Sequence, residues 1–457
     1  PDEFTAVRTG KVAEGTELYE RLSEKNLLRA TYDPARAVDH LRRRQAFLGS
    51  GPNLHILVLT LRCNETCVYC HASRAPMTAT ETDMSLETAE RAVDMALSTT
   101  SPSVTIEFQG GEPLVRFDTL QHVVAYATER NRELHKQLEF TLVTNLSLMN
   151  EERLAWLLTH RVQICTSLDG PRALHDKQRR LPQGSAFDEA TTWIRRINAK
   201  YEQMGLDPHV YRVEALPTST RDTLPLWKEL VDTYVELGCR AIFLRPVDPF
   251  GFAAKTRERV GSSREEYLAL YRRVVDYMIE LNLSGVEILE RYASIFLTKI
   301  LRGDDPNYLD IRNPCGAAIG QVAYGYDGKI FTCDEGRMLH EDGDDTFLIG
   351  DVATSGYREV MGHPTVRAMA IASNLDAQPD CDTCAYHPYC GVCPVHSHRT
   401  QGSIFGRMGD SSWCAVHKGI QDYLFEKIGQ GDPAVMEVFD RWTIARPRLH
   451  FIQASDE

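Results

Sequence analysis

Three cysteines near the start of the chain carry the clearest chemical signal. Cys63, Cys67 and Cys70 are separated by three and then two residues, so one tight loop can bring three thiols to a single metal centre. Thiolate is the ligand that selects zinc or an iron–sulfur cluster. A four-iron cluster held by three cysteines keeps one iron without a protein ligand, and a small molecule with an amine and a carboxylate can chelate that iron. A zinc knuckle would need a fourth ligand nearby.

The next motif, Gln109–Pro113, follows the second expected strand. Its paired glycines, Gly110 and Gly111, let a backbone run beside a ligand, and their peptide groups can hydrogen-bond an α-amino group. Taken alone, Gly-Gly-Glu is a common turn. Its position one strand–helix unit after the cysteine loop favours a ligand-binding role for this motif, including Glu112.

Polar residues also follow the third, fourth and sixth expected strands. Asn145 could face a cofactor or a substrate. Alternation along the fourth strand places Cys165, Ser167 and Asp169 on one face. Asp169 before Gly-Pro also fits a turn, and Cys165 fits a small buried side chain. Arg245 could hold a carboxylate of cofactor or peptide, or it could form a structural salt bridge.

The C-terminal third of the chain contains seven more cysteines in metal-type spacings. Asp327 and Gly328 give the signal of a tight hairpin, which would bring Cys315 and Cys333 together. Short Cys-x2-Cys pairs alone would suggest zinc. The seven cysteines are Cys315, Cys333, Cys381, Cys384, Cys390, Cys393 and Cys414.

Length and charge narrow the class of protein. The chain has 457 residues and a net charge of -13, which predicts two or three domains and argues against a general binder of nucleic acid or anionic membrane. No apolar run approaches the ~20 residues that span a bilayer. The N-terminus has no signal-peptide pattern, so we expect a cytoplasmic protein. Ten of the twelve cysteines lie in metal-type spacings, which is typical of cluster ligands rather than a disulfide framework.

Strands alternating with helices must position these residues. A helix is expected over 85–97 with Ser85 as its N-cap, and residues 264–303 also look helical. A short capped amphipathic helix is expected over 15–22. Six strand–helix units with right-handed crossovers build a parallel sheet curled into an open barrel, with function at the carboxyl ends of the strands. The expected strands are 54–61, 104–108, 139–143, 162–167, 210–215 and 241–244.

The cysteine loop, with Tyr69 just before its last cysteine, resembles the cluster loop of the radical S-adenosylmethionine (radical SAM) enzymes. The Gly-Gly-Glu segment resembles the motif of that family that holds the methionyl amine. A Ser-Leu-Asp-Gly run resembles that of the peptide-modifying members. This likeness implies that Ser167 lies near the adenosyl ribose and that Asp169 faces the substrate, where it accepts a proton after hydrogen-atom abstraction. The predicted cofactor-binding residues are Tyr69, Gly110, Gly111, Glu112, Asn145 and Ser167, the predicted cluster ligands are Cys63, Cys67 and Cys70, and the predicted catalytic residues are Asp169 and Arg245.

The order of the seven C-terminal cysteines resembles the SPASM domain of radical SAM enzymes that act on peptides and proteins. The chain departs from the usual pattern in having two rather than three residues between Cys390 and Cys393. The resemblance implies two auxiliary iron–sulfur clusters of the [4Fe–4S] type, an outer one on Cys381, Cys384, Cys390 and Cys414 and an inner one on Cys315, Cys333 and Cys393. The fourth ligand of the inner cluster stays open among Asp334, His396, His398, water and a substrate atom.

We therefore predict an α/β protein with a partial (β/α)6 radical SAM barrel and a C-terminal iron–sulfur SPASM domain. The barrel would cover residues 52–303, the SPASM domain 304–430, and a C-terminal tail 431–457. Residues 1–51 would form an N-terminal region. That region could be part of a leader-peptide recognition module, or it could merely pack on the barrel.

A narrower resemblance links the chain to the peptide maturases of His-Xaa-Ser systems. It rests on the segments 52–56, 105–113, 166–171, 242–246 and 389–391. This narrower resemblance does not settle the chemistry. The radical SAM and SPASM resemblances together predict an oxidoreductase that cross-links side chains of a ribosomally made precursor peptide (C–C, or C–O, C–N or C–S) after a 5'-deoxyadenosyl radical removes a Cβ hydrogen. The expected partners are that peptide with its leader and an electron donor such as flavodoxin or ferredoxin. The alternatives are a formylglycine-forming sulfatase maturase and a non-catalytic zinc or iron–sulfur binding module.

Overall fold

The computed structural model describes residues 2–306 and 309–444. The chain forms two compact units, residues 1–50 and 51–457. The first unit contains three helices, α1 (Asp2–Arg8), α2 (Glu17–Glu24) and α3 (Pro34–Arg44). The side chain of Thr16 accepts a hydrogen bond from the backbone N–H of Tyr19 and so caps α2. The short capped helix expected here is confirmed.

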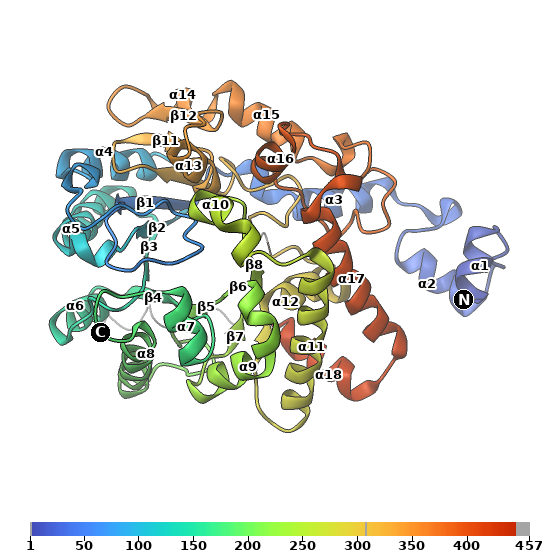
Figure 1. The fold of residues 1–457 in the computed structure, drawn as a ribbon. Helices are drawn as coiled ribbons and strands as arrows, with labels where there is room; N and C mark the ends of the chain where they lie inside the picture. The colour runs from blue at the N-terminus through green and yellow to red at the C-terminus, as the bar shows by residue number, and fades with distance from the viewer. Residues whose placement is uncertain (1, 307–308, 445–457) are drawn as a thin grey trace. The chain divides into compact units, whose positions relative to one another are not determined.

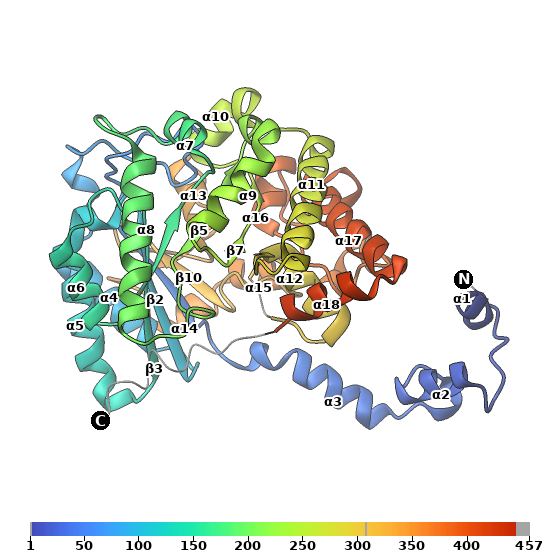
Figure 2. The same cartoon turned by 90° about the horizontal axis from the view of Figure 1, so that it is seen from below.

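The second unit is built on a sheet whose first part is parallel. Its first five strands pair in chain order, each parallel to the next. They are β1 (Leu54–Thr60), β2 (Ser103–Gly110), β3 (Gln137–Thr144), β4 (Val162–Ser167) and β5 (Glu214–Leu216). The intervening helices α4 (Leu86–Leu97), α5 (Phe117–Leu134) and α6 (Glu151–Thr159) lie outside the sheet in both views (Figures 1 and 2). Ser85 caps α4 as expected.

Alternation along the strands separates the two faces of this sheet. In β2, Val104, Ile106 and Phe108 are fully buried and belong to the main hydrophobic core, which also contains residues of α4 and α5. The intervening residues, Glu107 among them, are only half-buried and face away from the helices. The helix-facing side therefore supplies the packing energy, and the opposite side keeps polar groups for the interior of the barrel.

The fifth and sixth expected strands are shorter than predicted. Strand β5 begins at Glu214 rather than at 210, because the backbone N–H groups of Val210 and Tyr211 bond back to the carbonyl of Asp207 in a local turn. The expected strand 241–244 stops at Ile242: the Leu244 N–H donates to the Glu290 side chain, and its carbonyl accepts from the Tyr267 hydroxyl. The barrel therefore continues as two short parallel pairs. These are β6 (Thr218–Ser219) with β8 (Arg245–Pro246), and β7 (Ala241–Ile242) with β9 (Leu289–Glu290).

The C-terminal cysteine region extends the same sheet. Strand β10 (Gln321–Tyr324) pairs parallel with β1, and β11 (Lys329–Phe331) turns back antiparallel to it across the expected Asp-Gly hairpin. Strand β12 (Leu348–Asp351) completes an eight-stranded sheet in the order β12-β11-β10-β1-β2-β3-β4-β5. The predicted α/β fold is confirmed, with a parallel-dominated sheet at its centre.

Further helices surround this sheet and its C-terminal extension. They are α7 (Arg172–Gln178), α8 (Ala186–Gln203), α9 (Trp227–Glu236), α10 (Gly251–Val260), α11 (Arg264–Leu283), α12 (Arg291–Leu297), α13 (Asp334–Glu341), α14 (Tyr357–Met361), α15 (Pro364–Ala372), α16 (Pro394–Gln401), α17 (Ser412–Gln430) and α18 (Pro433–Trp442). The expected tail 431–457 thus begins with a helix, and its last thirteen residues, 445–457, lie outside the described residues. Within the described ranges, no helix is both long and apolar enough to cross a bilayer.

Candidate active site

The three-cysteine loop follows β1, and backbone hydrogen bonds to two other segments of the chain hold it in place. The Cys63 N–H donates to Ala75 O at 3.1 Å, and the loop N–H groups of Thr66 and Val68 donate to carbonyls at the end of α7. Burial raises the pKa of Cys63 and of Cys67, and the nearby Cys70 sulfur raises both further. The structure therefore brings the three thiols within electrostatic range of one another, as the spacing predicted.

The donor set fits an iron–sulfur cluster better than a single ion. A zinc ion draws its sulfur ligands to about 2.3 Å. A cubane cluster binds each thiolate through a different iron, so its cysteines stand further apart. Three half-buried thiols on one loop are the soft donors that such a cluster takes.

The close approach of two backbone segments explains why positions 110 and 111 are glycine, which the sequence did not reveal. A Cβ on Gly110 would lie 2.1 Å from the carbonyl oxygen of Thr60, and one on Gly111 would lie 2.4 Å from that of Arg62. The Gly111 N–H donates to Thr60 O at 2.8 Å. The glycines therefore let the end of β2 cross the end of β1 in backbone contact. Their role in binding a cofactor remains a prediction.

Glu112 is fully buried and ties the ends of β2 and β3 together. Its carboxylate accepts hydrogen bonds from Leu114 N–H, from the Thr144 hydroxyl at 2.7 Å and from Asn145 N–H at 2.8 Å. Burial raises the pKa of Glu112 to about 7 against these three bonds. The Asn145 amide lies 4.0 Å from the sulfur of Cys63. Glu112 and Asn145, two of the predicted cofactor-binding residues, thus lie next to the cysteine loop.

Asp169 lies at the end of β4, and both of its carboxylate oxygens are engaged. One oxygen accepts from the Tyr69 hydroxyl and from Arg179 Nε at 3.2 Å, and the other accepts from Thr218 N–H at 3.2 Å. The side chain has no exposed surface. Ser167, two residues earlier, is half-buried on the face turned away from the helices. The proton-accepting role of Asp169 remains a prediction, and the structure adds a second task, the anchoring of Tyr69 and Arg179.

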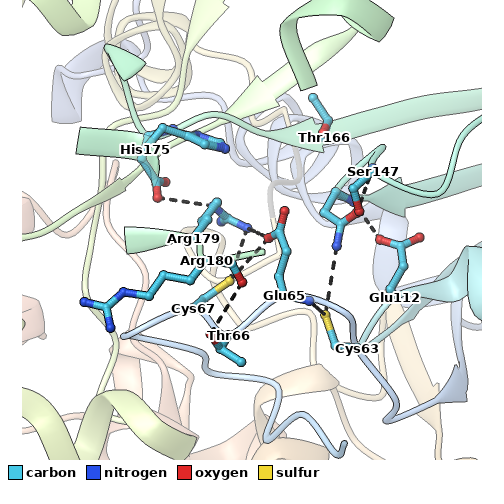
Figure 3. Close-up of polar contacts among 12 residues, drawn as sticks. Cys63, Glu65, Thr66, Cys67, Glu112, Ser147, Thr166, His175, Arg179 and Arg180 are labelled. Carbon is cyan, nitrogen blue, oxygen red and sulfur yellow. Dashed lines mark hydrogen bonds and ion pairs between the residues drawn. The ribbon is translucent and has the colours of Figure 1, made fainter. Parts of the chain in front are cut away.

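Sequence reasoning missed two charged residues at this loop. Glu65 lies between the cysteines and is only 1 % exposed. Arg179 reaches it from just beyond α7, with Nη1 3.7 Å from Glu65 Oε2 and 3.8 Å from Cys67 Sγ (Figure 3). Arg179 is 112 residues from Cys67, so no local pattern links them. The signal that was available is Glu65 itself, a charged residue between two closely spaced cysteines.

Arg245 forms the salt bridge that the sequence left open. Its Nη2 lies 3.3 Å from Asp310 Oδ2, and its guanidinium stacks over the Phe243 ring at 5.3 Å. Its side chain keeps 29 % of its surface exposed. The predicted catalytic role of Arg245 is untouched by this contact.

The C-terminal cysteines gather into two groups, divided as the resemblance implied. Four of them line a cavity of about 540 Å³: Cys381, Cys384, Cys390 and Cys414. Burial raises the pKa of Cys381 to about 12, and the other three sulfurs contribute to that shift. The second group is buried with Leu339, Phe347 and Val395, and it consists of Cys315, Cys333 and Cys393.

Two of the expected fourth ligands of the second group are engaged elsewhere. Asp334 pairs with Arg337 at 2.9 Å, and His398 lies 2.7 Å from Asp344. His396 is buried, and its ring lies 5.6 Å from that of Trp413. Glu335, which the sequence did not single out, adds to burial in raising the pKa of all three cysteines of this group, so its carboxylate lies near them.

The sequence model of the radical SAM superfamily matches residues 57–201. The chain therefore contains a radical SAM domain. Such a domain implies S-adenosylmethionine and a [4Fe–4S] cluster as cofactors, and it favours an enzyme over a non-catalytic binding module. The matched segment begins in β1 and includes the cysteine loop, the Gly-Gly-Glu segment and Asp169.

Curated relatives of this chain align with different shares of its length. An AdoMet-dependent heme synthase of Oleidesulfovibrio alaskensis is 24% identical over 76% of this chain and 83% of its own. A cysteine-type anaerobic sulfatase-maturating enzyme of Clostridium novyi is 22% identical over 72% of this chain and 83% of its own. An uncharacterized protein of Methanocaldococcus jannaschii is 30% identical over 25% of this chain, and that alignment spans only 38% of the relative.

Solved structures share the fold. Native anSMEcpe with bound AdoMet superposes with a TM-score of 0.68 at 18% identity, covering 85% of this chain and 99% of its own. Streptococcus suis SuiB bound to its precursor peptide SuiA gives 0.56 at 15% identity, covering 90% and 88%. The likeness extends well beyond the superfamily segment, so the predicted fold class is confirmed over most of the chain.

Proposed function

We propose that this radical SAM enzyme modifies a ribosomally made precursor peptide by an oxidative side-chain cross-link that begins at a Cβ hydrogen. The proposal is supported by one observation: a single β-sheet connects the three-cysteine loop to the region that holds the two C-terminal cysteine groups. The three-cysteine loop follows β1, and β10, which pairs with β1, belongs to the region holding the other two cysteine groups. Structural neighbours with this fold include SuiB bound to a precursor peptide and anSMEcpe bound to a peptide.

The residues of the chain divide the work as follows. Cys63, Cys67 and Cys70 would hold the cluster, which when bound and reduced supplies the electron that cleaves S-adenosylmethionine to methionine and a 5'-deoxyadenosyl radical. Glu112 and Asn145, whose positions are fixed by hydrogen bonds between strand ends, would orient the cofactor. The enclosing barrel excludes water, which protects a reactive radical and directs it to one C–H bond.

The C-terminal region would hold two auxiliary clusters. Cys381, Cys384, Cys390 and Cys414 would bind the outer one, and Cys315, Cys333 and Cys393 the inner one. An oxidative cross-link removes two electrons and two protons from the peptide: one of each leaves as the hydrogen atom taken by the 5'-deoxyadenosyl radical, an auxiliary cluster would accept the second electron, and Asp169 would take the second proton. The proposal further includes a leader on the peptide, a donor such as flavodoxin or ferredoxin, and a cytoplasmic location. It also includes the predicted domain boundaries between residues 51 and 52, 303 and 304, and 430 and 431.

A second candidate is a protein oxidase of the formylglycine-forming, sulfatase-maturing type. Sulfatase-maturating enzymes among the relatives support it, with 72% of this chain aligned in the Clostridium novyi case. The two candidates share the radical-forming step and differ only in the substrate and in the fate of the carbon radical. A substrate test therefore separates them.

The test begins with the radical-forming step. The reconstituted protein is reduced anaerobically with S-adenosylmethionine, and 5'-deoxyadenosine is quantified for the wild type, a Cys63/Cys67/Cys70→Ala triple variant and a Cys239→Ala control. Cys239 is a buried thiol in the hydrophobic core, outside all three cysteine groups. We expect product from the wild type and the control only. Product from the triple variant would contradict the ligand assignment.

The second stage identifies the substrate. Precursor peptides from genes that neighbour the enzyme's own gene, and a sulfatase-type cysteine peptide, are incubated with the active enzyme and examined by mass spectrometry. A precursor peptide that loses two hydrogens supports the cross-linking maturase. Conversion of the cysteine peptide to formylglycine supports the second candidate. If neither peptide changes while 5'-deoxyadenosine forms, both substrate assignments fail.

A further inference from the structure

A buried group of charges lies against one cysteine of the predicted cluster loop. Glu65 and Asp169 approach Arg179 from two different segments, and the three side chains are 2 %, 0 % and 12 % exposed. Figure 3 shows Arg179 directed toward Glu65 and Cys67. A buried arginine costs several kcal/mol in lost hydration unless it is paired. Glu65 and Asp169 supply that pairing for Arg179.

Arg179 has two partners besides the two carboxylates, the Tyr69 ring and the sulfur of Cys67. Its Nε lies 3.2 Å from Asp169 Oδ2, and its guanidinium lies 5.4 Å from the centre of the Tyr69 ring. Its Nη1 lies 3.8 Å from Cys67 Sγ. Glu65 Oε2 lies 3.5 Å from the same sulfur and 3.7 Å from Arg179 Nη1. One ligand sulfur thus has a cation and an anion in direct contact.

Contacts of this kind set reduction potentials. The potential of an iron–sulfur cluster depends on net charge, on hydrogen bonds to its sulfurs and on exposure to solvent. A neighbouring cation stabilises the electron that enters on reduction and raises the potential, and a neighbouring anion lowers it. Both effects are strong here because the surroundings exclude water.

We propose that Arg179 and Glu65 are a pair of positioning residues that set the reduction potential of the cluster on Cys63, Cys67 and Cys70, with Arg179 raising it and Glu65 lowering it. The pair touches the ligand sulfur rather than S-adenosylmethionine or a substrate. This inference rests on the radical SAM assignment and on the predicted ligands. It does not depend on which peptide, if any, the enzyme modifies.

The test is a redox titration of the iron-loaded protein, followed by electron paramagnetic resonance. Only the part of the signal that changes when S-adenosylmethionine is added is used, because that part reports the cluster with an open iron. Arg179→Gln should shift its midpoint potential to more negative values, and Glu65→Gln should shift it to more positive values. Opposite shifts are a signature that a merely structural role would not produce.

Two further variants complete the experiment. Arg180→Gln removes the same charge from the adjacent, exposed residue, whose side chain donates a hydrogen bond to the backbone carbonyl of Lys177, and it should leave the potential unchanged. Arg179→Lys keeps the charge and should lie nearer the wild type than Arg179→Gln. Equal potentials in the wild type, Arg179→Gln and Glu65→Gln, or shifts of the same sign in both, would overturn the proposal. If Arg179→Gln does not load iron, Glu65→Gln decides alone: a positive shift supports the proposal, and an unchanged or negative one overturns it.

Discussion

The Tyr69 hydroxyl donates a hydrogen bond to the carboxylate of Asp169, which lies 100 residues further along the chain. Both side chains are buried. The bond joins the cysteine loop after β1 to the end of β4, so the predicted cluster ligands and the predicted substrate-facing carboxylate belong to one hydrogen-bonded assembly. A substitution at either residue should therefore alter the position of the other side chain.

Replacing Tyr69 with Phe removes only the hydroxyl. Asp169 keeps its bonds to Arg179 and Thr218 but loses a donor to a buried charged group, so we expect a loss of about 2 kcal/mol in the free energy of unfolding. Anaerobic thermal unfolding of the iron-loaded protein measures it. Tyr32→Phe, at a tyrosine that is 51 % exposed, is the control. Equal stability of the two variants would show that the Tyr69 bond contributes nothing.

Replacing Asp169 with Asn keeps the shape and removes the charge that faces Arg179. We expect a destabilisation of about 3 kcal/mol, because one partner of a buried ion pair is lost. We also expect 5'-deoxyadenosine and modified peptide to fall together, since Asn cannot hold Arg179 and Tyr69 as a carboxylate does. Both products are measured in one assay. Undiminished 5'-deoxyadenosine with loss of the peptide product would instead support Asp169 as the proton acceptor.

His55 should make stability depend on pH. Burial lowers its pKa to about 4, and its ring bonds to the Tyr324 hydroxyl and to Pro52 O. Between pH 4 and about 6.5 the unfolded chain binds the proton and the folded chain does not, so this contribution to stability is lost as the pH falls through that window.

The comparison is between the wild type and His55→Gln. A shift of this size is worth on the order of 3 kcal/mol, so the two unfolding free energies should diverge from pH 4 to 6.5 and run parallel above it. Buried carboxyls such as Glu290, whose pKa burial raises to about 7, act with the opposite sign in the same window, so only the difference between the proteins is informative. Parallel curves throughout would contradict the assignment to His55.

Gly251 begins helix α10 where that helix meets the cysteine loop. A Cβ there would lie 2.5 Å from His71 O and 2.8 Å from Cys70 O, and the backbone has φ +56. Gly251→Ala should therefore cost about 2 kcal/mol more than Gly205→Ala, because overpacking adds to the backbone strain. Gly205 has φ +71 and nothing within 4 Å of a Cβ. Thermal unfolding measures the difference, and equal losses would show that α10 can move aside freely.

The sequence predicted what local patterns encode. The first four strands, the capped helix at Ser85 and the Asp-Gly hairpin depend on periodicity and turn chemistry within a few residues, and all are confirmed. The cysteine spacing predicted the loop because its three thiols lie within eight residues. The strand expected at 241–244 failed because side chains from 267 and 290, far along the chain, occupy the backbone groups of Leu244.

Long-range charge partners were beyond the reach of the sequence. The meeting of Arg179 with Glu65 and Cys67 depends on how α7 follows β4, and nothing in the spacing of 112 residues announces it. The sequence also did not reveal that Gly110 and Gly111 lie against the backbone of Thr60 and Arg62, a contact that leaves their predicted cofactor-binding role a prediction. Helix α10 was not expected at all, because its contacts with the cysteine loop join residues about 180 positions apart, as in the bond from Thr256 Oγ1 to Val68 O at 2.9 Å.

The cover of the cysteine loop has a consequence for how the enzyme is made. Phe252 N–H donates to Cys70 O, Arg337 reaches Ala72 O, and Asp342 holds the start of α10 through Gly251 N–H. A ribosome therefore releases the loop long before it releases the residues that close over it. During that interval the three thiols are open to whatever delivers iron, and to oxygen. Residues 251–342 leave the ribosome later, so the hydrogen bonds that hold Cys70 and Ala72 can form only after most of the chain has been made.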